Sequence, residues 1–249
     1  MALQPFFTYY GGKWRAAPHY PVPEHDTVIE PFAGSAGYAL RHPNLDIRLY
    51  DIDPIICGVW DYILKASESE ILALPDVETT VDDLIGIPQE ARWLIGLWLN
   101  KGAASPRKSP SAWMRSGMCP NSYWGGAIRE RIARQQQHVR HWRVENASFE
   151  DIPQRPATWF VDPPYEQSGK HYVHGAAGID FASLGQWCKQ RWGQVIVCEN
   201  EGATWLPFEQ FRSIKATPGA TRLGVSKELV WVNESSIPTA LHRRLGGGV

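Results

Sequence analysis

The residues best suited to chemistry form the string Asp162-Pro163-Pro164-Tyr165, which directly follows a short apolar run. Each proline fixes its own φ and restricts the residue before it, so neither a central strand nor a helix interior can continue through the string. The chain must therefore stop in one rigid shape, with an acid at the end of a buried strand and an aromatic ring just beyond it. A rigid turn with a capping aspartate is the structural alternative.

Such a corner suits the alkylation of an aromatic exocyclic amine. The lone pair of that nitrogen is delocalised into the ring and is a poor nucleophile. Two fixed acceptors, the Asp162 carboxylate and the Pro163 carbonyl, would localise the pair on the nitrogen by accepting hydrogen bonds from its two N–H groups. Tyr165 would stack on the base, which must leave a duplex to reach the site.

A second group of residues suits a nucleoside. The apolar run 27–30 ends at Glu30 and continues into a small-residue turn with Gly34 and Gly37, where the backbone can approach a ligand closely. Asp51 ends the next apolar run and can accept hydrogen bonds from both ribose hydroxyls. The turn lacks the G-x-G-x-x-G pattern, so a dinucleotide is the weaker interpretation, and a glycine turn alone is also compatible with a purely structural role.

Short apolar runs alternate with helical patterns along the chain. Strands are expected at residues 27–30, 46–51, 158–161 and 194–198, with an antiparallel pair at 211–214 and 228–232. Helices are expected after Gly37, from Asp53 as N-cap, at the Ser67 and Glu70 capping box, at 90–100, at 127–142 and from Asp180. Residues 101–126 read as an irregular loop. This alternation predicts a parallel α/β sheet that binds ligands at the carboxyl ends of its strands.

Charge is unevenly distributed along the 249 residues. Residues 92–143 contain ten lysines or arginines and a single acid, Glu130, giving +9, so the remainder of the chain carries −10. A basic block in an otherwise acidic chain favours a nucleic-acid partner, because phosphate contacts supply most non-specific affinity. A solvated helix face, which usually mixes the signs, is the alternative.

Four strings in this order, FFTYYGGK, VIEPFAGSAG, RLYDID and WFVDPPY, resemble the motifs of the Dam-like, alpha-group DNA adenine N6-methyltransferases. The resemblance runs from about Phe6 to Asn233. It implies an α/β fold: a Rossmann-like S-adenosylmethionine-dependent methyltransferase sheet with an inserted, mainly helical target-recognition domain. The implied division is a catalytic domain of residues 1–75 and 144–240, an inserted DNA-binding region of residues 76–143, and a flexible tail of residues 241–249.

The resemblance also implies a role for each matching residue. The catalytic tetrad falls on Asp162, Pro163, Pro164 and Tyr165. The positions implied to hold S-adenosylmethionine are Tyr9, Gly11, Gly12, Lys13, Glu30, Pro31, Phe32, Gly34, Ser35, Gly37, Asp51, Ile52 and Phe149.

Candidates for contact with double-stranded DNA come from the basic block and from the loop after the tetrad. They are Lys108, Arg115, Tyr123, Trp124, Arg129, Arg134 and His171, the arginines being better suited to phosphates than to base edges. Core packing remains the alternative for Tyr123 and Trp124, and also for Trp113. The spacing of His171 and His174 could suggest a metal, but a loop that closes on DNA is favoured, and no metal is expected.

The sequence also bears on the cellular location of the protein. The sequence has no apolar run of about 18 residues, no secretory start and no CxxC pair, so we expect a cytoplasmic location. The resemblance implies a bacterial or phage-infected cell and a monomer. The resemblance to phage and prophage members suggests a role in protecting DNA from host nucleases. The alternatives are RNA adenine or cytosine-N4 methylation and a non-catalytic, cofactor-sensing DNA-binding regulator.

Overall fold

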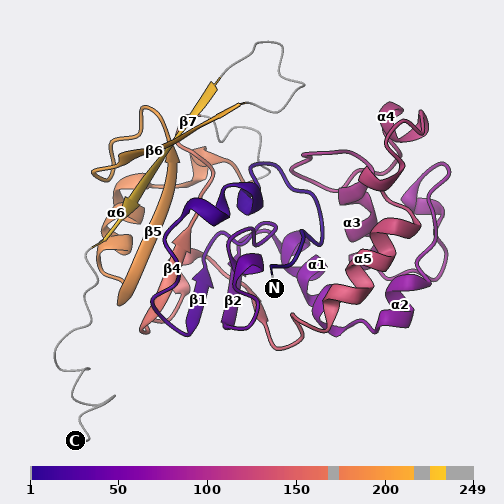
Figure 1. Ribbon diagram of the computed structural model, residues 1–249, viewed down its shortest axis with the longest axis horizontal. Helices are drawn as coiled ribbons and strands as arrows, with labels where there is room; N and C mark the ends of the chain where they lie inside the picture. Colours follow the sequence, from indigo (N-terminus) through magenta and orange to yellow (C-terminus); the bar gives the residue numbers. More distant parts are fainter. Residues whose placement is uncertain (1, 168–173, 216–224, 234–249) are drawn as a thin grey trace, which may run out of the picture.

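A seven-stranded mixed sheet organises the protein (Figure 1). The computed structural model describes residues 2–167, 174–215 and 225–233. The strands are β1 (Thr27–Glu30), β2 (Asp46–Asp51), β3 (Arg143–Asn146), β4 (Ala157–Val161), β5 (Gly193–Asn200), β6 (Glu209–Lys215) and β7 (Val225–Val232), in the order β3-β2-β1-β4-β5-β7-β6. β3, β2, β1, β4 and β5 are parallel, whereas β7 is antiparallel to both β5 and β6.

The order of the strands reverses between β1 and β4. From β1 the chain runs outward through β2 to β3, and it then returns to the other side of β1 as β4. In doubly wound sheets the crevice at such a switch point is where ligands bind, beyond the carboxyl ends of the strands. The predicted α/β class is thus confirmed, with a largely parallel sheet compatible with a Rossmann-like fold.

The helices follow local signals in the sequence. α1 (Pro54–Lys65) begins at Asp53, whose side chain accepts from the Ile55 amide, and α2 (Glu68–Leu72) begins with the capping box of Ser67 and Glu70, as predicted. α3 (Gln89–Trp98), α5 (Gly126–Gln136) and α6 (Phe181–Lys189) lie where helical spacing predicts them. The short α4 (Ala112–Arg115) lies inside the segment expected to be an irregular loop.

Two helix predictions are wrong. After Gly37 the chain forms only the 3-10 turn η3 (Ala39–Arg41), because Pro43 follows closely and has no amide hydrogen with which to continue a helix. α5 ends at Gln136 rather than at Trp142. Beyond it the chain tightens, with the Val139 amide donating to the Gln136 carbonyl at 3.1 Å and the Trp142 amide to the Val139 carbonyl at 2.9 Å. Val139 and Trp142 are buried, so the apolar spacing identified core positions but not their backbone conformation.

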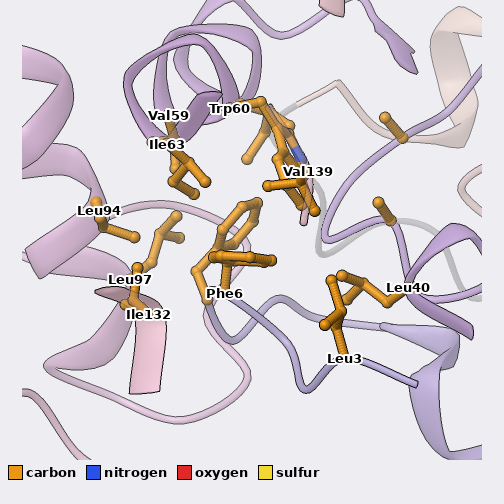
Figure 2. Packing of buried hydrophobic residues seen from close by; sticks show 14 of the residues in the cluster. Leu3, Phe6, Leu40, Val59, Trp60, Ile63, Leu94, Leu97, Ile132 and Val139 are labelled. Atoms are coloured by element: carbon orange, nitrogen blue, oxygen red, sulfur yellow. The ribbon is translucent and has the colours of Figure 1, made fainter. Parts of the chain in front are cut away.

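The larger hydrophobic core joins the N-terminal segment to the helices. Figure 2 shows Phe6 and Trp60 among side chains from α1, α3 and α5, and their rings meet edge to face with centroids 5.7 Å apart. The Trp98 indole donates to the Phe6 carbonyl at 2.8 Å, and the Thr8 hydroxyl donates to the Leu97 carbonyl at 2.6 Å. The helices from the segment predicted to be an inserted domain therefore share one core with the N-terminal segment and α1.

Candidate functional site

A cavity of about 710 Å³ lies at the carboxyl ends of β1, β2, β3 and β4. This size is within the range of pockets that hold a small ligand. All thirteen residues predicted to hold the cofactor line it. From the predicted tetrad, Asp162 and Pro164 line the cavity, whereas Pro163 and Tyr165 do not.

Asp51 ties the end of β2 to the glycine turn after β1. Its Oδ2 accepts from the Gly34 amide at 2.9 Å and its Oδ1 from the Asp53 amide at 2.9 Å. Burial raises the pKa of Asp51 to about 6, and these two amide donors oppose part of the rise. The carboxylate thus faces the cavity from a fixed position and retains lone pairs for a ligand's hydroxyl groups.

The N-terminal segment packs directly onto the glycine turn. A Cβ on Gly37 would lie 2.5 Å from the Trp14 amide nitrogen, and one on Gly12 would lie 2.9 Å from the Ser35 hydroxyl oxygen. Gly34 has a φ of 44°, which L side chains rarely adopt, and its carbonyl accepts from the Trp60 indole at 2.8 Å. These glycines therefore serve the packing of two chain segments that together form one wall of the cavity.

Glu30 is a buried acid at the end of β1. Its side chain is 2% exposed, and its Oε1 accepts from the Ala39 amide at 2.7 Å. Burial raises the pKa of Glu30 to about 8, with the amide bond opposing it. Glu30 is accordingly largely protonated at neutral pH.

Asp162 forms an ion pair with Lys13, a contact between the two ends of the predicted site. Lys13 Nζ lies 2.8 Å from Asp162 Oδ1, and the two side chains are 6% and 16% exposed. Burial raises the pKa of Asp162, while the Lys13 charge and the Tyr165 hydroxyl lower it. The Lys13 ammonium also donates to the Gly11 carbonyl at 3.0 Å, which fixes its position.

Tyr165 lies beside this pair. Lys13 Nζ is 4.7 Å from the centre of the Tyr165 ring, within the range of a cation–π contact. Tyr165, which is predicted to stack on a base, is thus in contact with Lys13 in this structure. Burial raises the pKa of the Tyr165 hydroxyl.

Two aromatic rings line the cavity near the glycine turn. The Phe32 and Phe149 rings lie 5.7 Å apart and are tilted by 31°. Phe149 belongs to η6 (Phe149–Asp151), whose N-cap is Ser148, and its other side meets the Trp187 ring edge to face at 5.5 Å. The pair offers apolar surface of the kind that a planar ring can contact.

The residues predicted to contact DNA differ in exposure. Tyr123 and Trp124 are buried, as the core-packing alternative predicts, and the Trp124 indole donates to the Pro75 carbonyl at 2.8 Å. Lys108 pairs with Asp82 at 2.8 Å and Arg129 pairs with Asp76 at 2.5 Å, whereas Arg115 and Arg134 are exposed and bond to backbone carbonyls of their own segments. His171 lies outside the described residues.

Part of the basic block is structural. Arg92 donates to the Ile87 and Leu84 carbonyls, Arg140 donates to the Ala66 carbonyl, and Arg131 donates to the Pro5 carbonyl while lying over the Trp98 ring. These three guanidinium groups hold segments together, and so the count of +9 overstates the charge available to a partner.

Several cavity residues were not predicted as site residues. Ser148, Glu150, Ile179 and Asp180 line it, as does His174, whose charge lowers the pKa of Asp51. The N-cap signals of Asp53 and Asp180 were read only as helix starts, although both residues also line the cavity. For Asp53, a helix cap two residues after the end of β2 was the available signal.

Comparison with known proteins adds no family assignment: no family model matches the chain, and no curated protein matches it significantly. Within the described ranges, no helix has the length and apolarity needed to cross a membrane. The same part of the chain contains no cluster of three His, Cys, Asp or Glu side chains arranged to hold a metal ion.

Proposed function

We propose that this protein transfers a methyl group from S-adenosylmethionine to the N6 amine of adenine in double-stranded DNA. The observation that carries the proposal is the single cavity in which the Asp162 corner meets the glycine turn and Asp51. A nucleoside-binding half and an amine-binding half are what such a transfer requires. Because both halves lie at the switch point of the sheet, their juxtaposition follows from the topology.

The cavity residues fit this cofactor by their chemistry. Asp51 would accept from ribose hydroxyls, and Phe32 and Phe149 would contact the adenine ring. The segment from Tyr9 to Lys13 would hold the methionine end. When bound, the cofactor supplies an electrophilic methyl group on a positively charged sulfur.

The chain's own residues would prepare the amine. An ionised Asp162 is the stronger acceptor for the amine, yet burial favours its protonated form. The Lys13 ion pair opposes that effect and favours the charged form of Asp162, although burial remains the larger influence on its pKa. We therefore assign Lys13 a positioning role in addition to the role at the methionine end.

The test is nucleoside mass spectrometry after incubation of the cofactor with unmethylated duplex DNA or with RNA. We expect N6-methyladenine in DNA from the wild type and a reduction of roughly 100-fold or more for Asp162→Asn, comparable to the loss of one preorganised electrostatic contact. Asp162→Asn keeps an oxygen for Lys13 and should bind the cofactor nearly as well as the wild type. Asp61→Asn, which alters an exposed acid of α1, is the matched control.

Other products would identify the alternatives. N4-methylcytosine, or methyladenine in RNA alone, would replace the proposed substrate. Cofactor binding with no methylated base in any nucleic acid would favour the regulator. Equal activity of wild type and Asp162→Asn would reject the catalytic assignment of Asp162.

A further inference from the structure

The most exposed aromatic side chain of the basic block is Trp113, on α4. Trp113 is 62% exposed, and Met118, five residues later, is 64% exposed. We call residues 106–118 the α4 projection, because α4 lies at the upper right of Figure 1, beyond α3 and α5. Two large apolar side chains exposed on one short segment are unusual, since most exposed apolar residues occur singly.

The α4 projection has a fixed base. The Arg107 amide donates to the Gly96 carbonyl at 3.0 Å and the Ser111 amide donates to the Leu99 carbonyl at 3.1 Å, so both bonds join it to the end of α3. Gly96 is required for this approach, because a Cβ there would lie 2.7 Å from the Arg107 carbonyl oxygen. Met114 packs against the core, and the neighbouring Trp113 remains exposed. A segment held in this way loses little further entropy when it binds a partner.

The segment that carries Trp113 is basic in sequence. Residues 101–118 contain Lys101, Arg107, Lys108 and Arg115 and no acid. Lys108 pairs with Asp82 of η4 (Val81–Asp83), whereas within the described ranges no acid lies at ion-pair distance from Lys101, Arg107 or Arg115. An exposed indole among cations matches the surface that nucleic acids contact, with phosphates meeting the cations and bases meeting the ring.

We propose that the α4 projection contacts double-stranded DNA, with Trp113 placed against base edges or between bases and Lys101, Arg107 and Arg115 on the phosphates. Apolar side chains that wedge between base steps unstack the duplex, which would assist the removal of a base from it. This inference deepens the proposed function and rests on it for the choice of DNA as the partner.

The test measures binding of a fluorescent duplex by anisotropy over a range of salt concentrations. We expect Trp113→Ala to weaken binding about tenfold, as the loss of one base–aromatic contact does, without changing the slope of log affinity against log salt. Arg107→Ala should reduce that slope by about one, as expected for one phosphate contact. Val22→Ala removes a similarly exposed apolar side chain from the loop before β1 and should bind as the wild type does.

The outcomes separate this inference from the proposed function. Wild-type affinity in Trp113→Ala, or no duplex binding by the wild type, would overturn the inference. So would a change of the wild-type oligomeric state in Trp113→Ala by sedimentation, since the surface would then join two copies. A loss of DNA binding in Trp113→Ala together with no methyl transfer by the wild type would support the inference and reject the proposed function. Cofactor affinity and thermal unfolding, which Trp113 should not affect, confirm an intact fold.

Discussion

The ion pair between Lys13 and Asp162 places two opposite charges in a nearly closed environment. Breaking a buried pair by removing one partner is strongly destabilising, because the other charge remains desolvated. We expect Lys13→Met to reduce the free energy of unfolding by about 3 kcal/mol at pH 8, measured by urea denaturation. Lys65→Met, which breaks an exposed pair with Asp61, should change it little.

The loss in Lys13→Met should depend on pH. Without Lys13, the pKa of Asp162 rises further above its value in the unfolded chain, so the folded form retains a proton that the unfolded form releases. The variant should thus approach wild-type stability in acid, where Asp162 is protonated in both states, and lose stability as the pH rises through the raised pKa. A deficit independent of pH would indicate that Lys13 acts only through packing.

The buried acid Glu30 gives a second prediction about a single residue. The pKa of Glu30 is about 8 in the folded chain and 4.5 in the unfolded chain, so the folded chain binds the proton more tightly. This contribution to stability is fully present below pH 4.5 and is lost as the pH rises from 4.5 through 8. Glu30→Gln keeps an acceptor for the Ala39 amide and has no proton to lose. Between pH 5 and 8 the wild type should therefore lose on the order of 3 kcal/mol more than Glu30→Gln in urea unfolding. Parallel curves would show that Glu30 ionises normally.

At the scale of elements, the contact between the N-terminal segment and the glycine turn forms one wall of the cavity. We expect Gly37→Ala to cost about 2 kcal/mol of stability, because its Cβ would overlap the backbone of Trp14, which cannot swing aside. Gly126→Ala is the matched control, since nothing lies within 4 Å of a Cβ at this first residue of α5. It should be neutral or slightly stabilising, and equal losses in the two variants would contradict this account.

Rules that use only neighbouring residues, such as helix capping, predicted the elements whose boundaries depend on neighbouring residues. The strand ending at Asp51, the N-cap at Asp53 and the capping box at Ser67 required only neighbouring residues. β3 was missed because it is a largely exposed edge strand with no apolar alternation to mark it. The end of α5 was misplaced because buried residues continue beyond it at helical spacing.

The residues that line the cavity could be predicted where ordered motifs contain them, but the contacts between distant residues could not. The resemblance predicted thirteen residues that hold the cofactor, and all of them line the cavity. Nothing in the sequence around Lys13 or around Asp162 indicates that these two residues form an ion pair. The exposure of Trp113 and the burial of Trp124 also depend on the packing of α3 and α5. In a chain with 12 tryptophans, composition cannot distinguish the two.

At the scale of the whole molecule, one core cluster includes Phe6, Leu94, Ile132 and Phe160, which come from the N-terminal segment, α3, α5 and the sheet. We therefore expect a single cooperative unfolding transition, with far-ultraviolet circular dichroism and tryptophan fluorescence coinciding along a urea titration. Two separated transitions would show that the predicted inserted region folds as an independent domain.

The two carboxyl groups of Glu30 and Asp51 make the charge of the cavity variable across the neutral range. With pKa values of about 8 and about 6, each becomes negative as the pH rises from 5 to 9. A positively charged sulfonium ligand would be attracted more strongly over the same interval in which the folded chain loses stability. Under the proposed function, the working pH would be a compromise between binding the cofactor and keeping the fold, and Glu30→Gln should be more stable at high pH and bind a sulfonium ligand less tightly.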